Sequence, residues 1–154
     1  DADVLGTPGD AWYMLLPTLN NERIMVGAQC LGAIDGVLED ALAYMQQRKA
    51  FGKTIGDLQN TQFKLAELQT EAVVGRQFTD NCIKLFMQGE LDAVDAAMAK
   101  MWLSNMHCKV VDECLQLFGG YGYMAEYPIA RLNADARVQR IYGGATSGVS
   151  LNNK

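Results

Sequence analysis

The chain has 154 residues, of which 49% are hydrophobic and 20% are charged. This length suits one domain with a substantial core, and this balance is that of a globular protein rather than a disordered one. The formal net charge of -5 argues against a nucleic-acid partner. No apolar run reaches membrane-spanning length and the first residues lack a signal-peptide layout, so we expect neither a membrane span nor a secretory leader.

The beginning of the chain is rich in turn residues. Residues 1–17 include Gly6, Pro8, Gly9 and Pro17 and have little hydrophobic periodicity. Glycine and proline interrupt regular structure, so this segment is predicted to be a connector.

The first long helix is predicted to follow this connector. Asn20 and Asn21 offer side-chain caps, and Glu22 falls in the first turn, where a negative charge meets the positive end of the helix dipole. Apolar residues then recur at three- and four-residue spacing as far as Lys49. Gly52, in the segment Phe51-Gly52-Lys53, is a typical helix-terminating residue, so the helix should end near Lys49.

Three further helices are expected, and no strand pattern competes with them. They run from about Leu58 to Gln88 with Asp57 as cap, from Asp92 as cap to Phe118, and from Pro128 to roughly Tyr142. Short connections between long helices make antiparallel neighbours, so we predict an all-α, up-and-down four-helix bundle. It should occupy residues 18–144, with residues 145–154 as a flexible tail.

Cysteine and histidine usage excludes several kinds of chemistry. The cysteines lie in apolar helical patterns without CxxC spacing, which favours buried free thiols in a reducing compartment and no metal site. The single histidine, His107, lacks the Glu-x-x-His partners of a di-iron bundle and the nucleophile motif of a hydrolytic triad. We expect His107 to lie on a helix surface or to be an interior residue whose polar atoms have hydrogen-bond partners. The four cysteines are Cys30, Cys82, Cys108 and Cys114.

Taken without any family resemblance, the glycine pairs and the Arg48-Lys49 pair each allow a structural and a functional interpretation. The glycines around Gly119-Gly120 and the Gly143-Gly144 pair are either ordinary helix ends or a ligand cradle of unshielded amides. Arg48 and Lys49 either complement the dipole of the helix that they end or grip a pyrophosphate.

Six sequence blocks between residue 12 and about residue 146 follow one another in a specific order and spacing. They are Arg48-Lys-Ala-Phe-Gly-Lys53, Leu58-Gln59 with Leu65-Ala66-Glu67, Ala96-Ala-Met-Ala-Lys100, Gln116-Leu-Phe-Gly-Gly-Tyr-Gly-Tyr123, Glu126-Tyr-Pro128, and Asp135-Ala-Arg-Val138 followed by Ile141-Tyr-Gly-Gly144. Together they resemble the C-terminal helical domain of flavin-dependent acyl-CoA dehydrogenases. The resemblance implies a homodimer or homotetramer of three-domain subunits, with residues 1–17 leading in from a β-domain outside this chain.

The resemblance also implies a catalytic base. In that family a carboxylate removes the α-proton of an acyl-CoA thioester while the β-hydrogen leaves as hydride to N5 of FAD. Many members place this carboxylate where this chain has Gly143. A subset resembling the long-chain and isovaleryl-CoA enzymes has Gly-Gly there and takes its glutamate from the start of the first long helix, just before an arginine. Glu22, followed by Arg23, matches that glutamate, although taken alone it would be explained by the helix dipole.

The ligand contacts implied by the resemblance fall into two groups. On the FAD side they are Arg48, Phe51, Gln59, Gln116, Gly119, Gly120 and Thr146, of which Arg48 and Phe51 would reach the FAD of a neighbouring subunit. On the substrate side they are Asn20 and Arg23 at the CoA thioester and the Gly143 amide as a donor to the thioester carbonyl. Ala145 displaces Thr146 by one place from the family pattern.

The function implied is FAD-dependent α,β-dehydrogenation of an acyl-CoA in fatty acid β-oxidation or branched-chain catabolism. Electrons would pass to an electron-transfer flavoprotein, in the bacterial cytoplasm or the mitochondrial matrix. A chain without the other domains would bind FAD poorly and be inactive alone. The alternative is a noncatalytic helical-bundle assembly module that retains only the oligomer interface.

Overall fold

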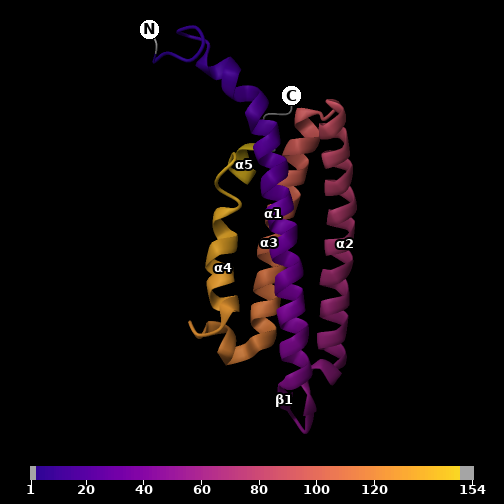
Figure 1. The fold of residues 1–154 in the computed structure, drawn as a ribbon. Helices are drawn as coiled ribbons and strands as arrows, with labels where there is room; N and C mark the ends of the chain where they lie inside the picture. The colour runs from indigo at the N-terminus through magenta and orange to yellow at the C-terminus, as the bar shows by residue number, and fades with distance from the viewer. Residues whose placement is uncertain (1–2, 150–154) are drawn as a thin grey trace.

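The computed structural model describes residues 3–149, and these form a bundle of helices (Figure 1). The helices are α1 (Ala11–Gln47), α2 (Gln59–Gln88), α3 (Ala93–Phe118), α4 (Pro128–Val138) and the four-residue α5 (Thr146–Val149). The connections contain β1 (Lys49–Ala50), β2 (Lys53–Thr54) and two 3-10 turns, η1 (Ile55–Asp57) and η2 (Gly119–Tyr123). The predicted all-α four-helix bundle is confirmed. No helix within residues 3–149 is long and apolar enough to cross a membrane.

The helix α3 is at the centre of the bundle and packs against α1, α2 and α4 (Figure 1). Its Leu103 side chain is fully buried, and burial of such a side chain stabilises a fold by about 1.5–3 kcal/mol. The helices α1 and α3 approach closely here, because a Cβ added at Gly27 would lie 2.9 Å from Leu103 Cδ1. This close contact fixes the relative position of the parts of α1 and α3 that carry Glu22 and Lys100.

Local chemistry explains several helix ends as the sequence predicts. The Gly89 residue that ends α2 has φ +73°, a conformation that glycine adopts without steric cost. The Asp92 carboxylate accepts a hydrogen bond of 2.9 Å from the Val94 amide at the start of α3. Pro128 occupies the first turn of α4, where its missing N–H has no helical acceptor.

The predicted start of the first helix is wrong. The helix α1 begins at Ala11 rather than near Asn20, and it continues through Pro17. The Thr18 hydroxyl donates to the Leu15 carbonyl at 2.7 Å, which adds a hydrogen bond next to the proline that cannot donate one. Glu22 therefore lies about three turns inside the helix, too far from its end to interact with the dipole.

Three smaller predictions also need correction. Asp57 does not cap α2; its carboxylate instead accepts from the Thr54 amide and hydroxyl, at 3.2 and 2.7 Å, and closes η1. The helix α4 ends at Val138 rather than near Tyr142. The start of the predicted tail contains α5, while its residues 150–154 lie outside the described part of the chain.

The four cysteines are free, as predicted. Three of them, Cys30, Cys82 and Cys114, are buried, and Cys108 is half-buried. Burial raises the pKa of the Cys30 and Cys114 thiols to about 12, so both are neutral at physiological pH. Within residues 3–149, no group of three or more His, Cys, Asp or Glu side chains could hold a metal ion.

Candidate functional site

The Glu22 carboxylate lies beside the turn that follows α4. This turn contains Gly143 and Gly144, with φ of +65° and +96°, values that side chains other than glycine rarely allow. A Cβ added at Gly143 would lie 3.8 Å from Glu22 Oε1 and 3.7 Å from Val26 Cγ2. The segment between α4 and α5 runs alongside α1, as Figure 1 shows. The structure thus brings together the acid of the first helix and the paired glycines that the sequence singles out.

A fully buried lysine holds the same turn from the other side. Lys100 on α3 is 0% exposed, and its ammonium donates to the Gly144 carbonyl oxygen at 2.6 Å. Burial lowers the pKa of Lys100, the neighbouring Cys30 raises it, Arg23 lowers it and Glu22 raises it. Glu22 and Lys100 thus carry opposite charges beside adjacent residues of the same glycine turn.

The predicted substrate residues Asn20 and Arg23 are half-buried on α1, on either side of Glu22 in the sequence. The Nε atom of Arg23 is buried and has no hydrogen-bond partner among residues 3–149. A buried donor without an acceptor costs about 1–3 kcal/mol, so this atom is a local cost to the fold.

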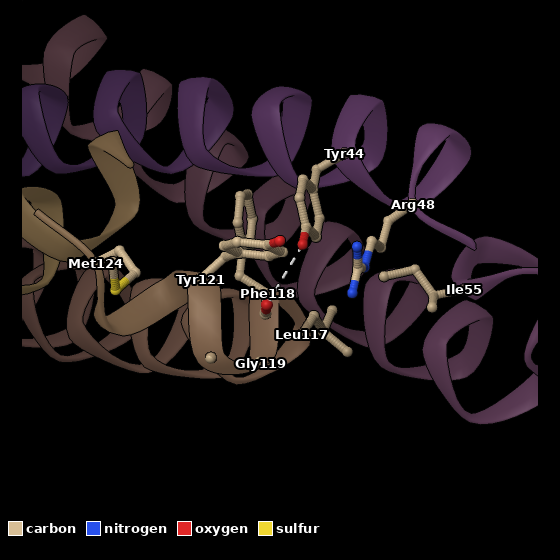
Figure 2. A pocket seen from close by; sticks show the side chains of 9 residues that line it. Tyr44, Arg48, Ile55, Leu117, Phe118, Gly119, Tyr121 and Met124 are labelled. Atoms are coloured by element: carbon tan, nitrogen blue, oxygen red, sulfur yellow. Dashed lines mark hydrogen bonds between the residues drawn. The ribbon is translucent and has the colours of Figure 1, made fainter. Parts of the chain in front are cut away.

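A second site lies at the other end of α1, where an open pocket of about 440 Å³ is formed (Figure 2). Its floor is aromatic: the Tyr44 and Phe118 rings stack with centroids 4.0 Å apart and planes 9° from parallel. The Arg48 guanidinium lies over the Tyr121 ring at 5.1 Å. The other residues that line it are Ile55, Leu117, Gly119, Gly120 and Met124.

The glycines of this pocket leave their backbone accessible. A Cβ added at Gly119 or Gly120 would meet no heavy atom within 4 Å, so both glycines leave open space on that side, while the Gly119 amide itself donates to the Gln116 carbonyl. A guanidinium suits phosphate oxygens, and stacked rings suit a flat aromatic group. Arg48, Gly119 and Gly120, three of the predicted cofactor residues, therefore meet in a pocket whose chemistry fits a nucleotide with a pyrophosphate.

The other predicted cofactor residues are not part of this pocket. Phe51 is 92% exposed in the turn between β1 and β2, with φ +53°. Gln59 and Gln116 are exposed on α2 and α3. Thr146 is bound within the chain, because its amide and hydroxyl both donate to the Arg140 carbonyl, at 3.0 and 3.1 Å. Within residues 3–149, these four side chains therefore do not line the pocket that contains Arg48.

Sequence reasoning missed two contributors to these sites. Lys100 was considered only as part of a sequence block, although it falls three residues after the apolar Ala97 on the buried face of its helix. Tyr44 precedes Arg48 by one helical turn and shares its face, which is the signal that could have placed an aromatic ring beside the cation.

Comparison with known proteins agrees with this fold. The all-α bundle is the fold of the helical C-terminal domain of acyl-CoA dehydrogenases. The family model described as "Acyl-CoA dehydrogenase, C-terminal domain" matches residues 9–152. The chain belongs to the acyl-CoA dehydrogenase family, as its C-terminal domain.

Individual relatives agree with this assignment. The chain is 45% identical to the mitochondrial long-chain specific acyl-CoA dehydrogenase of Mus musculus, over 92% of this chain and 33% of that protein. It superposes on an acyl-CoA dehydrogenase from Geobacillus kaustophilus with a TM-score of 0.92 and 39% identity, covering 95% of this chain and 38% of that one. A glutaryl-CoA dehydrogenase from Mycobacterium smegmatis, described in complex with FADH2, has a TM-score of 0.83 and 26% identity over 86% and 34% of the two chains. The chain spans about a third of the length of the curated relatives.

Proposed function

We propose that this chain is the C-terminal part of an FAD-dependent acyl-CoA dehydrogenase of the long-chain and isovaleryl-CoA subset. The reaction is α,β-dehydrogenation of an acyl-CoA thioester, with Glu22 as the base that takes the α-proton. The observation that carries the proposal is the position of Glu22 Oε1, 3.8 Å from where a Cβ at Gly143 would lie. The acid and the side-chain-free turn therefore face one another, and nothing about the helix dipole explains Glu22 so far inside α1.

The chain's own residues supply the acid–base part of this chemistry. Glu22 removes the α-proton, and the Gly143 amide donates to the thioester carbonyl, where negative charge develops as the proton leaves. The half-buried Asn20 and Arg23 flank Glu22 in the sequence and would offer hydrogen bonds to the CoA thioester. A glycine at 143 keeps this space open for the substrate.

The cofactor part of the proposal rests on the aromatic pocket. When bound, FAD supplies N5 as the acceptor of the β-hydride. Arg48, Gly119 and Gly120 would hold the pyrophosphate of the FAD of a neighbouring subunit, with the rings of the pocket beside its adenosine portion. Phe51, Gln59, Gln116 and Thr146 would add contacts from outside the pocket, and the Thr146 hydroxyl oxygen can still accept a hydrogen bond.

Several wider features belong to the same proposal. The complete protein would contain the domains that this chain lacks, would form a homodimer or homotetramer, and would pass its electrons to an electron-transfer flavoprotein. Its compartment would be the mitochondrial matrix or the bacterial cytoplasm. The isolated chain is expected to be inactive, because one wall of a cofactor site cannot offset the entropy lost on binding FAD.

The experiment that tests this function replaces Glu22 by glutamine in the complete protein. Glu22→Gln keeps the shape of the side chain and removes its basicity, and we expect turnover to fall by about 10²–10⁴-fold. The flavin spectrum and the flavin content are expected to stay unchanged. Glu39→Gln is the matched control, because Glu39 is exposed further along the same helix, and it should leave turnover unchanged. Wild-type turnover in Glu22→Gln would overturn the proposal.

A further inference from the structure

Lys100 is a buried cation that the proposed chemistry does not use. It is the largest of the fully buried side chains, and removal of an ammonium from water costs several kcal/mol unless it is paired. Its partner is a neutral backbone oxygen, the carbonyl of Gly144 at 2.6 Å, which is a charge-assisted hydrogen bond. This bond joins α3 to a turn 44 residues further along the chain.

The turn needs such an anchor because of its composition. Gly143 and Gly144 have no side chains to pack, and both have positive φ. After them the chain is held by the Thr146 amide, which donates to the Arg140 carbonyl at 3.0 Å. The Lys100 ammonium adds a hydrogen bond that ties Gly144 to α3.

We infer that Lys100 is a positioning residue, which holds the Gly143-Gly144 turn at the distance from Glu22 that the reaction needs. The inference rests on the proposed function. The Gly143 amide and the Glu22 carboxylate must face the same thioester, and displacement of the turn by a fraction of an ångström lengthens the hydrogen bond to the developing negative charge. Because Lys100 is fully buried within the fold, the role inferred for it is exerted through the turn.

Replacement of Lys100 by methionine in the flavin-loaded complete protein tests this role. Methionine has a similar length and no donor, so it removes the cost of burying an ammonium while leaving the Gly144 carbonyl without this partner. We expect kcat per bound flavin to fall about 10–100-fold with KM nearly unchanged, because an amide that acts on the transition state affects kcat. Lys100→Arg, which keeps donors and charge, should recover most of the loss. Lys109→Met removes another lysine of α3, which is half-buried and paired with Glu71 on α2, and should leave kcat unchanged.

A second readout does not depend on turnover. Amide hydrogen exchange at residues 143–146 should be faster in Lys100→Met than in the wild type, with the rest of α3 unchanged. A purely structural lysine would instead lower the flavin-loaded fraction and leave kcat per bound flavin at the wild-type value, and that result overturns the inference. If Lys100→Met binds no flavin, Lys100→Gln, whose side chain is too short for the same contact, is measured by the same criteria.

Different results would overturn the base role of Glu22 and the positioning role of Lys100. Glu22→Gln is measured beside the Lys100 variants. An inactive Glu22→Gln with a fully active Lys100→Met removes the positioning role and leaves the proposed function intact. A fully active Glu22→Gln removes the proposed function, whatever the Lys100 variants do.

Discussion

The two candidate sites are near opposite ends of the bundle and are built in different ways. Glu22 and Arg48 are about 40 Å apart along α1. The Arg48 pocket is formed by stacked rings, with Tyr44 and Phe118 in near-parallel contact. The Glu22 site is formed by a carboxylate and a side-chain-free turn, which a buried ammonium holds in place.

Because the two sites are built differently, substitutions in them should affect different quantities. A pocket of packed rings beside a guanidinium binds through its shape and charge, so a change there should alter affinity for the ligand. A base beside a hydrogen-bond donor acts through placement, so a change there should alter the rate of the chemical step. The separation along α1 also supports the assignment of the Arg48 pocket to the FAD of a neighbouring subunit rather than to the cofactor beside Glu22.

The largest effect expected at the pocket end follows removal of its cation. Arg48→Gln in the complete protein should weaken FAD binding about 10–100-fold, because a hydrogen bond between charged groups is worth about 1.5–3 kcal/mol. Turnover per bound flavin should stay unchanged. FAD affinity is measured by the flavin that the protein retains during dilution. The control is Arg76→Gln, which removes an exposed ion pair with Asp35. A loss of turnover per bound flavin in Arg48→Gln would contradict the claim that this pocket affects only FAD affinity.

A matched pair of glycine substitutions compares the two ends directly. Gly143→Ala places a side chain at φ +65°, which costs about 1–2 kcal/mol, beside the Glu22 carboxylate. We expect kcat to fall about tenfold with flavin content unchanged. Gly120→Ala enters open space without a positive φ and should leave kcat as it is. Equal kcat values for the two variants would show that the turn does not need glycine.

A smaller effect concerns His107, which lies buried on α3 with both ring nitrogens unpartnered among residues 3–149. Burial lowers the pKa of His107 below its usual value of about 6.5. The unfolded state therefore takes up a proton before the folded state does. This contribution to stability is complete above pH ~6.5 and is lost as the pH falls toward the folded pKa.

The variant His107→Gln, which does not titrate, should remove this part of the pH dependence. Between pH 7 and 5, the free energy of unfolding of the wild type should fall more steeply than that of the variant, by at most about 1.4 kcal/mol per pH unit. Denaturant titrations at each pH measure the difference. Parallel curves would mean that His107 is already solvated in the folded protein.

The smallest effect is expected for Tyr44→Phe. The Tyr44 hydroxyl donates to the Phe118 carbonyl at 3.5 Å, the long limit of a hydrogen bond, while the stacked ring is kept in the variant. Flavin affinity and the unfolding temperature should therefore stay close to the wild type. Tyr44→Ala, which removes the ring, is the comparison, and it should lower flavin affinity. A large effect of Tyr44→Phe would mean that the pocket depends on its polar atom rather than on its rings.

Sequence reasoning was reliable where the cause is local. Asp92, Gly89 and Pro128 mark helix ends through chemistry within a few residues. The predicted start of α1 was wrong because Pro17 was taken as a sign of a connector. The structure instead has an exposed first part of the helix, from Ala11 to Leu16, that continues through Pro17.

The candidate site was predictable only in part. The resemblance pointed to Glu22 and Gly143, which the structure brings together. The role of Lys100 could not be read from spacing, because its partner is the carbonyl of Gly144, 44 residues away, and backbone oxygens leave no signature in a sequence. For the same reason the stacking of Tyr44 on Phe118 becomes visible only when α1 and α3 are packed.

The central claim, that Glu22 takes the α-proton, is tested most directly by proton exchange without hydride transfer. An acyl-CoA analogue with sulfur in place of the β-methylene has no β-hydride to lose, so only the α-proton step remains. In D₂O the flavin-loaded complete protein should exchange the α-protons of this analogue, and Glu22→Gln should do so at least about 100-fold more slowly, with the analogue still bound. Exchange at the wild-type rate in Glu22→Gln would contradict the assignment of the base.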